Sequence, residues 1–186
     1  MIYYYLMKLI LLRHEERHEN PLFFTSLVED GFKRAENELP KKINDLKPDV
    51  IYCSPFRRTI QTIRPYCIKY NKKINIEYSL YEYIHAIEFT EENFKHDVSE
   101  LNKNEYIDII NTYTSYISLN ELVYPEDEIK IKKRIFNFIN KLKKIHKDKT
   151  VLLVSHMSVL NMCKKYYDNK TELEDELKMG SLTILV

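Results

Sequence analysis

Glycine and tryptophan are scarce in this chain of 186 residues, which contains two glycines and no tryptophan. A chain of this length would carry roughly 13 glycines at a usage of about 7%. Lysine, isoleucine, asparagine and tyrosine are abundant instead, and all four have AT-rich codons. We therefore interpret the shortage of glycine as a bias of the genome. We expect motifs that ordinarily contain glycine to have other residues in its place here.

Cysteines are also few, and the charges nearly cancel. Cys53, Cys67 and Cys163 are too scattered for a disulfide scaffold or a cysteine-rich zinc site, so we expect idle thiols in a reducing compartment. The net charge of +1, from 29 basic and 28 acidic residues, provides no field that would attract a polyanion. Nucleic-acid and membrane partners are therefore not expected, and nothing in the sequence indicates an oligomeric state.

Long hydrophobic runs are absent too. The apolar stretch over residues 1–12 is shorter than the roughly 18 residues of a membrane span, and it lacks the early positive charge and cleavage site of a signal peptide. We therefore expect a cytoplasmic protein. With 44% hydrophobic and 31% charged residues, the composition is globular, and the length suits one domain over residues 1–186.

The sequence does contain short apolar runs that alternate with helical patterns. The runs are short and apolar enough for strands that are buried on both faces of a mostly parallel sheet. They cover residues 8–12, 50–53, 74–76, 150–154 and 182–186. Apolar residues at three- and four-residue steps predict a helix from Phe32 to Leu46, kinked at Pro40. The same spacing predicts a lysine-rich helix from Ile131 to Ile145 with a solvated outer face.

These elements predict an α/β fold, a three-layer sandwich with helices on both faces of the central sheet. Residues 83–124 are polar and rich in tyrosine, and they show no strand pattern. We expect this segment to be partly helical and to form a small helical lobe over the cleft, as an insertion within the domain. Its tyrosines are expected in the core or on the surface, with stacking on a substrate as the alternative.

Arginine, histidine and serine follow three of the predicted strands, in the segments Arg13–His14, Ser54–Arg58 and Ser155–His156. Ligands of open α/β sheets bind at the carboxyl ends of the strands, so we expect these side chains to share one cleft. Guanidinium groups match the oxygens of a phosphoryl group, and a neutral imidazole can attack phosphorus. The pattern therefore predicts phosphoryl transfer through a phosphohistidine.

Several motifs, in order and spacing, resemble those of the histidine phosphatase superfamily, which includes the cofactor-dependent phosphoglycerate mutases. The most specific match is Ser54-Pro-Phe-Arg-Arg-Thr-Ile-Gln-Thr62, which is similar to the family's Ser-Pro-Leu-x-Arg-Ala-x-Gln-Thr. The segment Arg13–Glu16 is similar to the opening Arg-His-Gly-Glu of the family. Further similarities lie at Leu27–Ala35, Leu80–Glu82, Pro125–Glu128 and Val154–Met157. Only residues 83–124 have no counterpart.

The resemblance implies a role for seven residues. His14 would be the nucleophile, and Glu82 would donate a proton to the leaving group. The phosphoryl group and substrate would be bound by Arg13, Arg17, Asn20, Arg58 and His156. Glu15, Glu16 and Glu88 are alternative acids, and Glu82 is preferred because it lies just beyond the predicted strand at residues 74–76. The family uses no metal, and no cofactor is expected.

The expected activity is hydrolysis of a phosphomonoester in a small phosphorylated substrate or a phosphopeptide. Mutase-type phosphoryl transfer is an alternative, although residues 83–124 offer a short segment for a lobe that encloses the intermediate. Glu15 and Met157 stand where the family has glycine, and a side chain there could crowd or repel the phosphate. A catalytically weak module that binds a phosphorylated ligand is therefore a second alternative.

Two hydrolase mechanisms of other kinds are less favoured by the sequence. Residues His14–His18 also match the zinc-protease pattern H-E-x-x-H, which works only on a helix. Strand-like residues precede the pattern and Asn20-Pro21 follows it, so a helix is not expected there. Serine catalysis through Ser155 or Ser158 would lack the Gly-x-Ser-x-Gly elbow.

Overall fold

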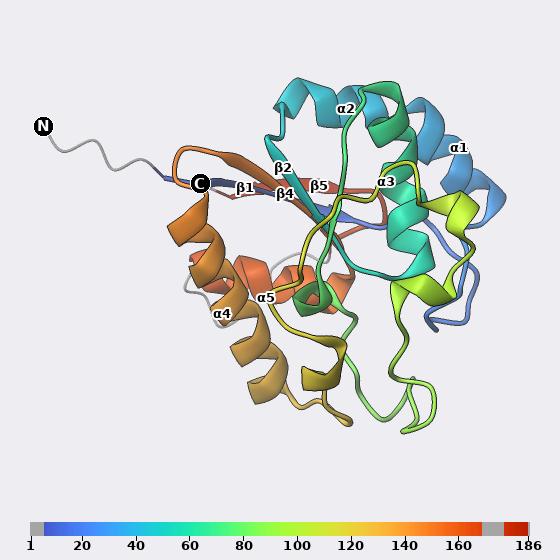
Figure 1. The fold of residues 1–186 in the computed structure, drawn as a ribbon, viewed down its shortest axis with the longest axis vertical. Coiled ribbons are helices and arrows are strands. Elements are labelled where there is room, and N and C mark those ends of the chain that lie inside the picture. Colours follow the sequence, from blue (N-terminus) through green and yellow to red (C-terminus); the bar gives the residue numbers. More distant parts are fainter. Residues whose placement is uncertain (1–5, 169–176, 186) are drawn as a thin grey trace, which may run out of the picture.

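The structure, a computed structural model, describes residues 6–168 and 177–185. Within these residues, five strands form one sheet in the order β3-β2-β4-β1-β5 (Figure 1). The strands are β1 (Lys8–Arg13), β2 (Val50–Cys53), β3 (Asn75–Ile76), β4 (Thr150–Ser155) and β5 (Leu182–Leu185). The first four are parallel, and β5 runs antiparallel to β1 at one edge.

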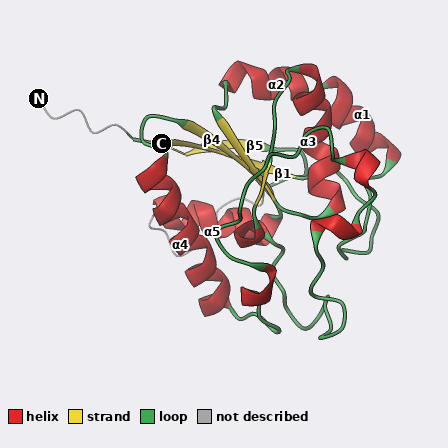
Figure 2. Cartoon of the chain, viewed as in Figure 1, coloured by secondary structure: helices red, strands yellow, loops and turns green. Residues whose placement is uncertain are grey.

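Helices cover both faces of this sheet, which confirms the predicted three-layer sandwich (Figures 1 and 2). One layer holds α1 (Glu29–Asn37), α2 (Leu39–Leu46) and α3 (Arg57–Lys69), and the other holds α4 (Glu128–Ile145) and α5 (Met157–Asp168). Successive residues of β1 face opposite layers: Ile10 and Leu12 pack in the core beneath α1–α3, whereas Leu9 and Leu11 pack against α4 and α5.

The single kinked helix predicted from Phe32 to Leu46 is wrong, because the segment forms two helices. α1 ends at Asn37 and α2 begins at Leu39, with Glu38 between them. Pro40 lies in the first turn of α2, where its missing N–H group would have had no helical partner. The proline therefore starts a second helix, which turns the chain toward β2.

The strand predictions are nearly correct at their ends. β1 and β4 each extend one residue further than predicted, to Arg13 and Ser155, and β5 is described up to Leu185. The predicted end at Val186 lies outside the described residues. β3 contains only Asn75 and Ile76, since Ile74 forms an isolated bridge to the inserted segment.

The inserted segment, residues 83–124, is described throughout and contains no α-helix. Its helical structure is three single 3-10 turns, at Val98–Glu100, Lys103–Glu105 and Leu119–Glu121. A buried carboxylate at the end of β3 holds it: Glu77 accepts hydrogen bonds from Tyr113 Oη (2.8 Å), Ser115 Oγ (2.8 Å) and Tyr116 N (3.0 Å). The lobe is thus largely irregular because specific polar contacts, rather than an apolar stripe, fix its path.

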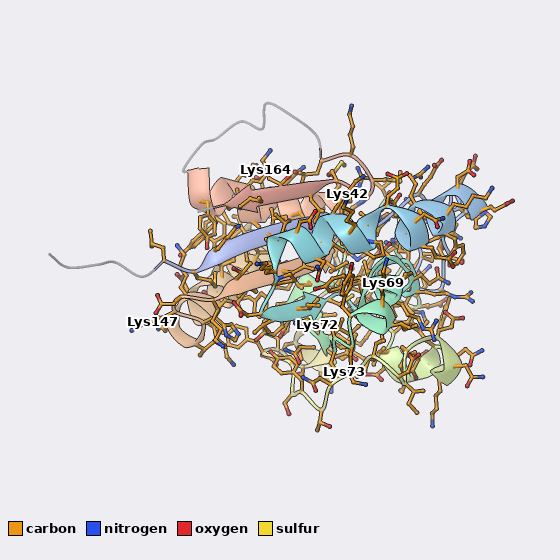
Figure 3. All side chains as sticks on the ribbon, turned by 90° about the horizontal axis from the view of Figure 1, so that it is seen from above. Lys42, Lys69, Lys72, Lys73, Lys147 and Lys164 are labelled. Atoms are coloured by element: carbon orange, nitrogen blue, oxygen red, sulfur yellow. The ribbon has the colours of Figure 1, made fainter. Side chains whose placement is uncertain are left out.

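Lysines lie on the outer surfaces of the helical layers. On α4, Ile131 and Ile135 are buried whereas Lys132 and Lys133 are exposed, as the amphipathic pattern predicts. Figure 3 labels lysines from both layers, among them the exposed Lys42 on α2. The lysines labelled there lie on α2, α3 and α5 and in the loops that follow α3 and α4.

The cysteines are buried, and their thiols are weakly acidic. Cys53, Cys67 and Cys163 are free and buried. Burial raises the pKa of the Cys67 and Cys163 thiols to about 12, so both stay protonated near neutral pH. Among the helices that the structure describes, none is long and apolar enough to cross a membrane.

Candidate active site

The polar side chains predicted to share a cleft meet at the carboxyl ends of β1, β2 and β4. The parallel register pairs Arg13 with Ser155, so the residues that follow each strand, His14 and His156, leave the sheet side by side. The backbone N–H of His14 donates to the carbonyl of Ser155 (3.1 Å). The ring centroids of the two histidines are 5.4 Å apart. Residues distant in the sequence thus form one cluster.

His14 is held as a neutral imidazole of defined tautomer. Its Nδ1 lies 2.7 Å from the carbonyl oxygen of Glu15, which can only accept, so Nδ1 carries the proton. The Nε2 lone pair is therefore free of a proton. Burial, reinforced by the nearby Arg58 guanidinium, holds the pKa of His14 well below its usual value. A buried neutral imidazole with an unprotonated Nε2 is the form that acts as a nucleophile.

Arg58, His156 and Glu82 form a compact triangle beside this ring. Arg58 Nη2 lies 3.1 Å from His156 Nδ1 and 3.3 Å from Glu82 Oε2. His156 Nδ1 and Glu82 Oε2 are 3.2 Å apart. The guanidinium is fixed from behind by the Leu22 carbonyl, which accepts from Nη1 at 2.9 Å, and His156 Nε2 lies 2.9 Å from Ser54 Oγ. Three polar groups thus converge on one point.

Burial determines the charge in the triangle. It raises the pKa of Glu82, and the opposing effect of the Arg58 charge is smaller. Burial and the Arg58 charge hold the pKa of His156 well below its usual value. Burial also lowers the pKa of Arg58 to about 10, which leaves the guanidinium charged at neutral pH. The triangle therefore combines one fixed cation, one neutral imidazole and one carboxyl group that keeps its proton to unusually high pH.

The competing glutamates point to other partners. Glu15 and Glu16 both pair with Arg34, at 2.8 and 2.9 Å. Glu88 pairs with His85 at 3.3 Å. Glu82, in contrast, contacts both Arg58 and His156, and it follows the 3-10 turn Tyr78–Leu80 at the end of β3. The geometry therefore favours Glu82 over its three competitors as the acid.

Three further residues expected at the site lie around its edge. Arg13 Nη1 donates to the Leu177 carbonyl (2.6 Å), and Arg17 Nη1 donates to the His18 carbonyl (2.7 Å). The positive charges of Arg13 and Arg17 both contribute to the lowered pKa of His14. Asn20 is exposed, and its Oδ1 accepts from the N–H of Leu22 (3.0 Å). Its role as a phosphate ligand stays a prediction.

The structure disfavours the other two hydrolase mechanisms. Residues 14–18 form no helix, and His14 is buried whereas His18 is exposed, so the two imidazoles do not share a helical face. In the described part of the chain, no group of three or more His, Cys, Asp or Glu side chains could hold a metal ion. Ser155 Oγ donates to the Leu80 carbonyl (2.7 Å), and it thereby anchors the segment that leads to Glu82.

Two residues of the site were not assigned a role from the sequence. Ser54 orients His156, and Thr62 Oγ1 accepts from the N–H of Glu15 (2.9 Å) while it donates to the carbonyl of Arg58 (2.7 Å). Both lie inside the segment Ser54–Thr62 that carries the most specific motif. Thr62 acts on backbone groups and Ser54 on a side chain 102 positions away, and a local sequence pattern identifies neither kind of partner.

Comparisons with known proteins identify the family and the fold. The family model of the histidine phosphatase superfamily (branch 1) matches residues 9–185. A search of curated proteins gave no significant match.

Three solved structures share the fold over nearly the whole chain. A putative alpha-ribazole-5'-P phosphatase from Escherichia coli has 21% identity and a TM-score of 0.69, covering 96% of this chain and 89% of that chain. An ecdysone phosphate phosphatase from Bombix mori has 15% identity and a TM-score of 0.69, covering 96% and 88%. A phosphoserine phosphatase mutant from Entamoeba histolytica has 20% identity and a TM-score of 0.64, covering 97% and 91%.

Proposed function

We propose that this chain, which belongs to the histidine phosphatase superfamily (branch 1), hydrolyses a phosphomonoester through a covalent phosphohistidine on His14. The observation that carries the proposal is the state of His14: its Nδ1 proton is held by the Glu15 carbonyl, and its ring lies 5.4 Å from that of His156. The fixed cation of Arg58 and the carboxyl group of Glu82 lie at the same place. A nucleophile, a binding group for phosphoryl oxygens and a proton donor are thereby combined.

In the first step, His14 Nε2 attacks phosphorus and the bond from phosphorus to the leaving oxygen breaks. The ring gains positive charge, which the hydrogen bond from Nδ1 to the Glu15 carbonyl stabilises. Arg58 binds the non-bridging oxygens, and His156 does so through Nδ1, whose protonation the bound anion favours. The proton of Glu82 moves to the leaving oxygen. An anionic phosphoryl group next to Glu82 further favours its protonated form before this step.

In the second step, a water molecule attacks the phosphorus of the phosphohistidine. Glu82, now a carboxylate, accepts a proton from this water, and the bond between phosphorus and Nε2 breaks. The imidazole returns to its neutral form and inorganic phosphate is released. Arginines supply the positive charge throughout, so the proposed reaction requires no metal.

The proposed substrates are small phosphorylated metabolites or phosphopeptides. Solved structures that share the fold include phosphatases for ecdysone phosphate, alpha-ribazole-5'-P and phosphoserine, as their names state. The side chain of Glu15, which stands where the family has glycine, is directed to Arg34, away from the triangle of Arg58, His156 and Glu82. This direction favours an active enzyme over a module that only binds phosphorylated ligands.

The purified protein, assayed with EDTA present, should release inorganic phosphate from at least one member of a panel of phosphorylated metabolites, phosphopeptides and aryl phosphates. Phosphate released should equal substrate consumed. Interconversion of phosphoglycerates with little free phosphate would instead indicate a mutase. Tight binding without turnover would indicate a binding module, and turnover only after metal addition would contradict the metal-independent mechanism.

Glu82→Gln should impair poor leaving groups selectively. Removal of a general acid should slow formation of the phosphoenzyme from an alkyl phosphate by about 10²-fold or more, and its formation from p-nitrophenyl phosphate by less than about tenfold, because nitrophenolate departs unprotonated. Rapid quench measures this first step apart from the second, in which Glu82 accepts a proton whichever substrate was used. With an alkyl phosphate, the wild-type rate should fall as pH rises through the raised pKa of Glu82, since the proton needed by the leaving group is then lost.

At low pH, the loss of activity should set in at a lower pH than an ordinary histidine would give. Protonation of His14 blocks its attack, but its pKa is lowered, so turnover should persist below the ordinary pKa of histidine.

For the Glu82→Gln variant, Glu16→Gln is the matched control, because Glu16 pairs with Arg34 outside the triangle. If Glu82→Gln slows phosphoenzyme formation equally from the alkyl and the aryl phosphate, Glu82 is not the acid. The same conclusion follows if Glu16→Gln slows phosphoenzyme formation selectively from the alkyl phosphate.

A further inference from the structure

The two glycines of the chain both pack against the residues that follow His14. A Cβ atom at Gly31 of α1 would collide with the backbone carbonyl of Glu16, and one at Gly180 would collide with the Glu15 carboxylate. Gly180 also has a φ of +68°, a conformation that other residues rarely adopt. In a chain so poor in glycine, both are found where the Glu15–Glu16 segment leaves no room for a side chain.

Glu15 is fixed through both its backbone and its side chain. Its N–H donates to Thr62 Oγ1 (2.9 Å), its carbonyl accepts from His14 Nδ1 (2.7 Å), and its Oε2 accepts from Arg34 Nε (2.8 Å). Its side chain is only 3% exposed. Gly180 N donates to the backbone carbonyl of His14 at 3.1 Å. The carbonyl that holds the His14 tautomer therefore belongs to a residue whose side chain is anchored independently.

We propose that the ion pair between the buried Glu15 and the partly exposed Arg34 positions the nucleophile, by holding the Glu15 peptide whose carbonyl binds His14 Nδ1. Glu15 and Arg34 are thus positioning residues, which act through His14 rather than on the substrate. The inference rests on the proposed role of His14. It assigns a role to the Glu15 carboxylate, which lies next to His14 in the sequence.

Glu16 provides a matched comparison for Glu15. Both carboxylates bind the same guanidinium, Glu15 at Nε and Glu16 at Nη2. The side chain of Glu16 is 52% exposed, whereas that of Glu15 is 3% exposed. Without Arg34, Glu16 would be stabilised by water, whereas Glu15 would be left as a buried charge with no counter-ion. Loss of Arg34 should therefore act through Glu15 alone.

The test begins with Arg34→Met. A buried carboxylate without its partner must move toward water or take up a proton, and either change displaces the Glu15 peptide. We expect kcat for an aryl phosphate to fall by about 10- to 100-fold, with KM changed by less than about threefold. The variant disturbs the orientation of the His14 ring rather than the binding of the substrate. ¹⁵N NMR of the imidazole should show a smaller population of the Nδ1–H tautomer of His14.

Second-site variants separate positioning from general destabilisation. Glu15→Gln should lower kcat and the Nδ1–H population when Arg34 is present but not further in the Arg34→Met background, because both changes break the same ion pair. Glu16→Gln should change neither quantity in either background. If Arg34→Met does not fold, Arg34→Lys keeps the charge but loses the Nε contact, and it should shift the tautomer in the same direction.

Two results would overturn the proposal. One is a folded Arg34 variant with wild-type kcat and tautomer population. The other is an effect of Glu15→Gln on kcat and tautomer population that is as large in the Arg34→Met background as in the wild type. The NMR measurement requires no turnover, so absence of phosphatase activity would contradict the proposed function while the tautomer populations still decide whether the ion pair positions His14.

Discussion

Replacement of His14 by alanine should abolish the phosphoenzyme and reduce turnover by about 10⁴-fold or more, as expected when a covalent nucleophile is removed. No neighbour can take its place, because His156 Nδ1 lies against Arg58 Nη2 and its Nε2 lies against Ser54 Oγ. The wild-type protein, incubated with a labelled phosphoryl donor, should carry an adduct that is labile in acid and stable in alkali. Peptide mapping should place it on His14.

His18→Ala is the control for this experiment. His18 lies four residues from the nucleophile in the same segment, but it is exposed, and its loss should leave both labelling and turnover intact. Label that persists in the His14→Ala variant would contradict the assignment. An acid-stable adduct would indicate a serine ester instead, with Ser54 and Ser155 as the residues to examine.

Arg58→Met should lower kcat by about 10²-fold or more, the effect expected when a preorganised charge on the transferring group is lost. The guanidinium is fully buried, and its two terminal nitrogens have separate tasks: Nη1 binds the Leu22 carbonyl and Nη2 reaches His156 and Glu82. Arg58→Lys should recover little activity, because an ammonium group is a single point charge that cannot make both sets of contacts.

The Arg58→Met variant should nevertheless fold. Burial favours the neutral forms of both His156 and Glu82, so removal of the cation leaves no stranded opposite charge. Arg57→Met is the matched control, since the adjacent Arg57 pairs with Glu105 (2.5 Å) instead of the triangle. The rate of phosphoenzyme formation, measured by rapid quench, gives the loss of activity in each variant. Equal losses in the two variants, or a folded Arg58→Met with kcat within about tenfold of wild type, would contradict this role.

The sequence by itself determined the layers of the fold and grouped the side chains proposed for the site. Strands such as Val50–Cys53 and Thr150–Ser155 are recognisable because burial on both faces requires a continuous apolar run, which is a local property. His14, Arg58 and His156 could be grouped because parallel strands bring their carboxyl ends to one edge of the sheet. The motif resemblance then supplied the family, which the family model confirms over residues 9–185.

Local patterns were less informative where no apolar repeat exists. The irregular path of residues 83–124 depends on partners far along the chain. Glu77, for example, binds residues 36 to 39 positions away. A helical pattern can be read from three or four successive turns, but a loop fixed by one buried carboxylate cannot.

Only the tertiary structure decided how the glutamates divide their tasks. Glu15, Glu16, Glu82 and Glu88 have the same side chain. Glu15 and Glu16 directly follow His14, and Glu88 lies shortly after Glu82. Packing buries Glu82 against Arg58 and His156 and turns Glu15 toward Arg34. The acidity of a carboxyl group depends on its burial and on the charges around it, and both arise from residues brought together across the sheet and between its helical layers.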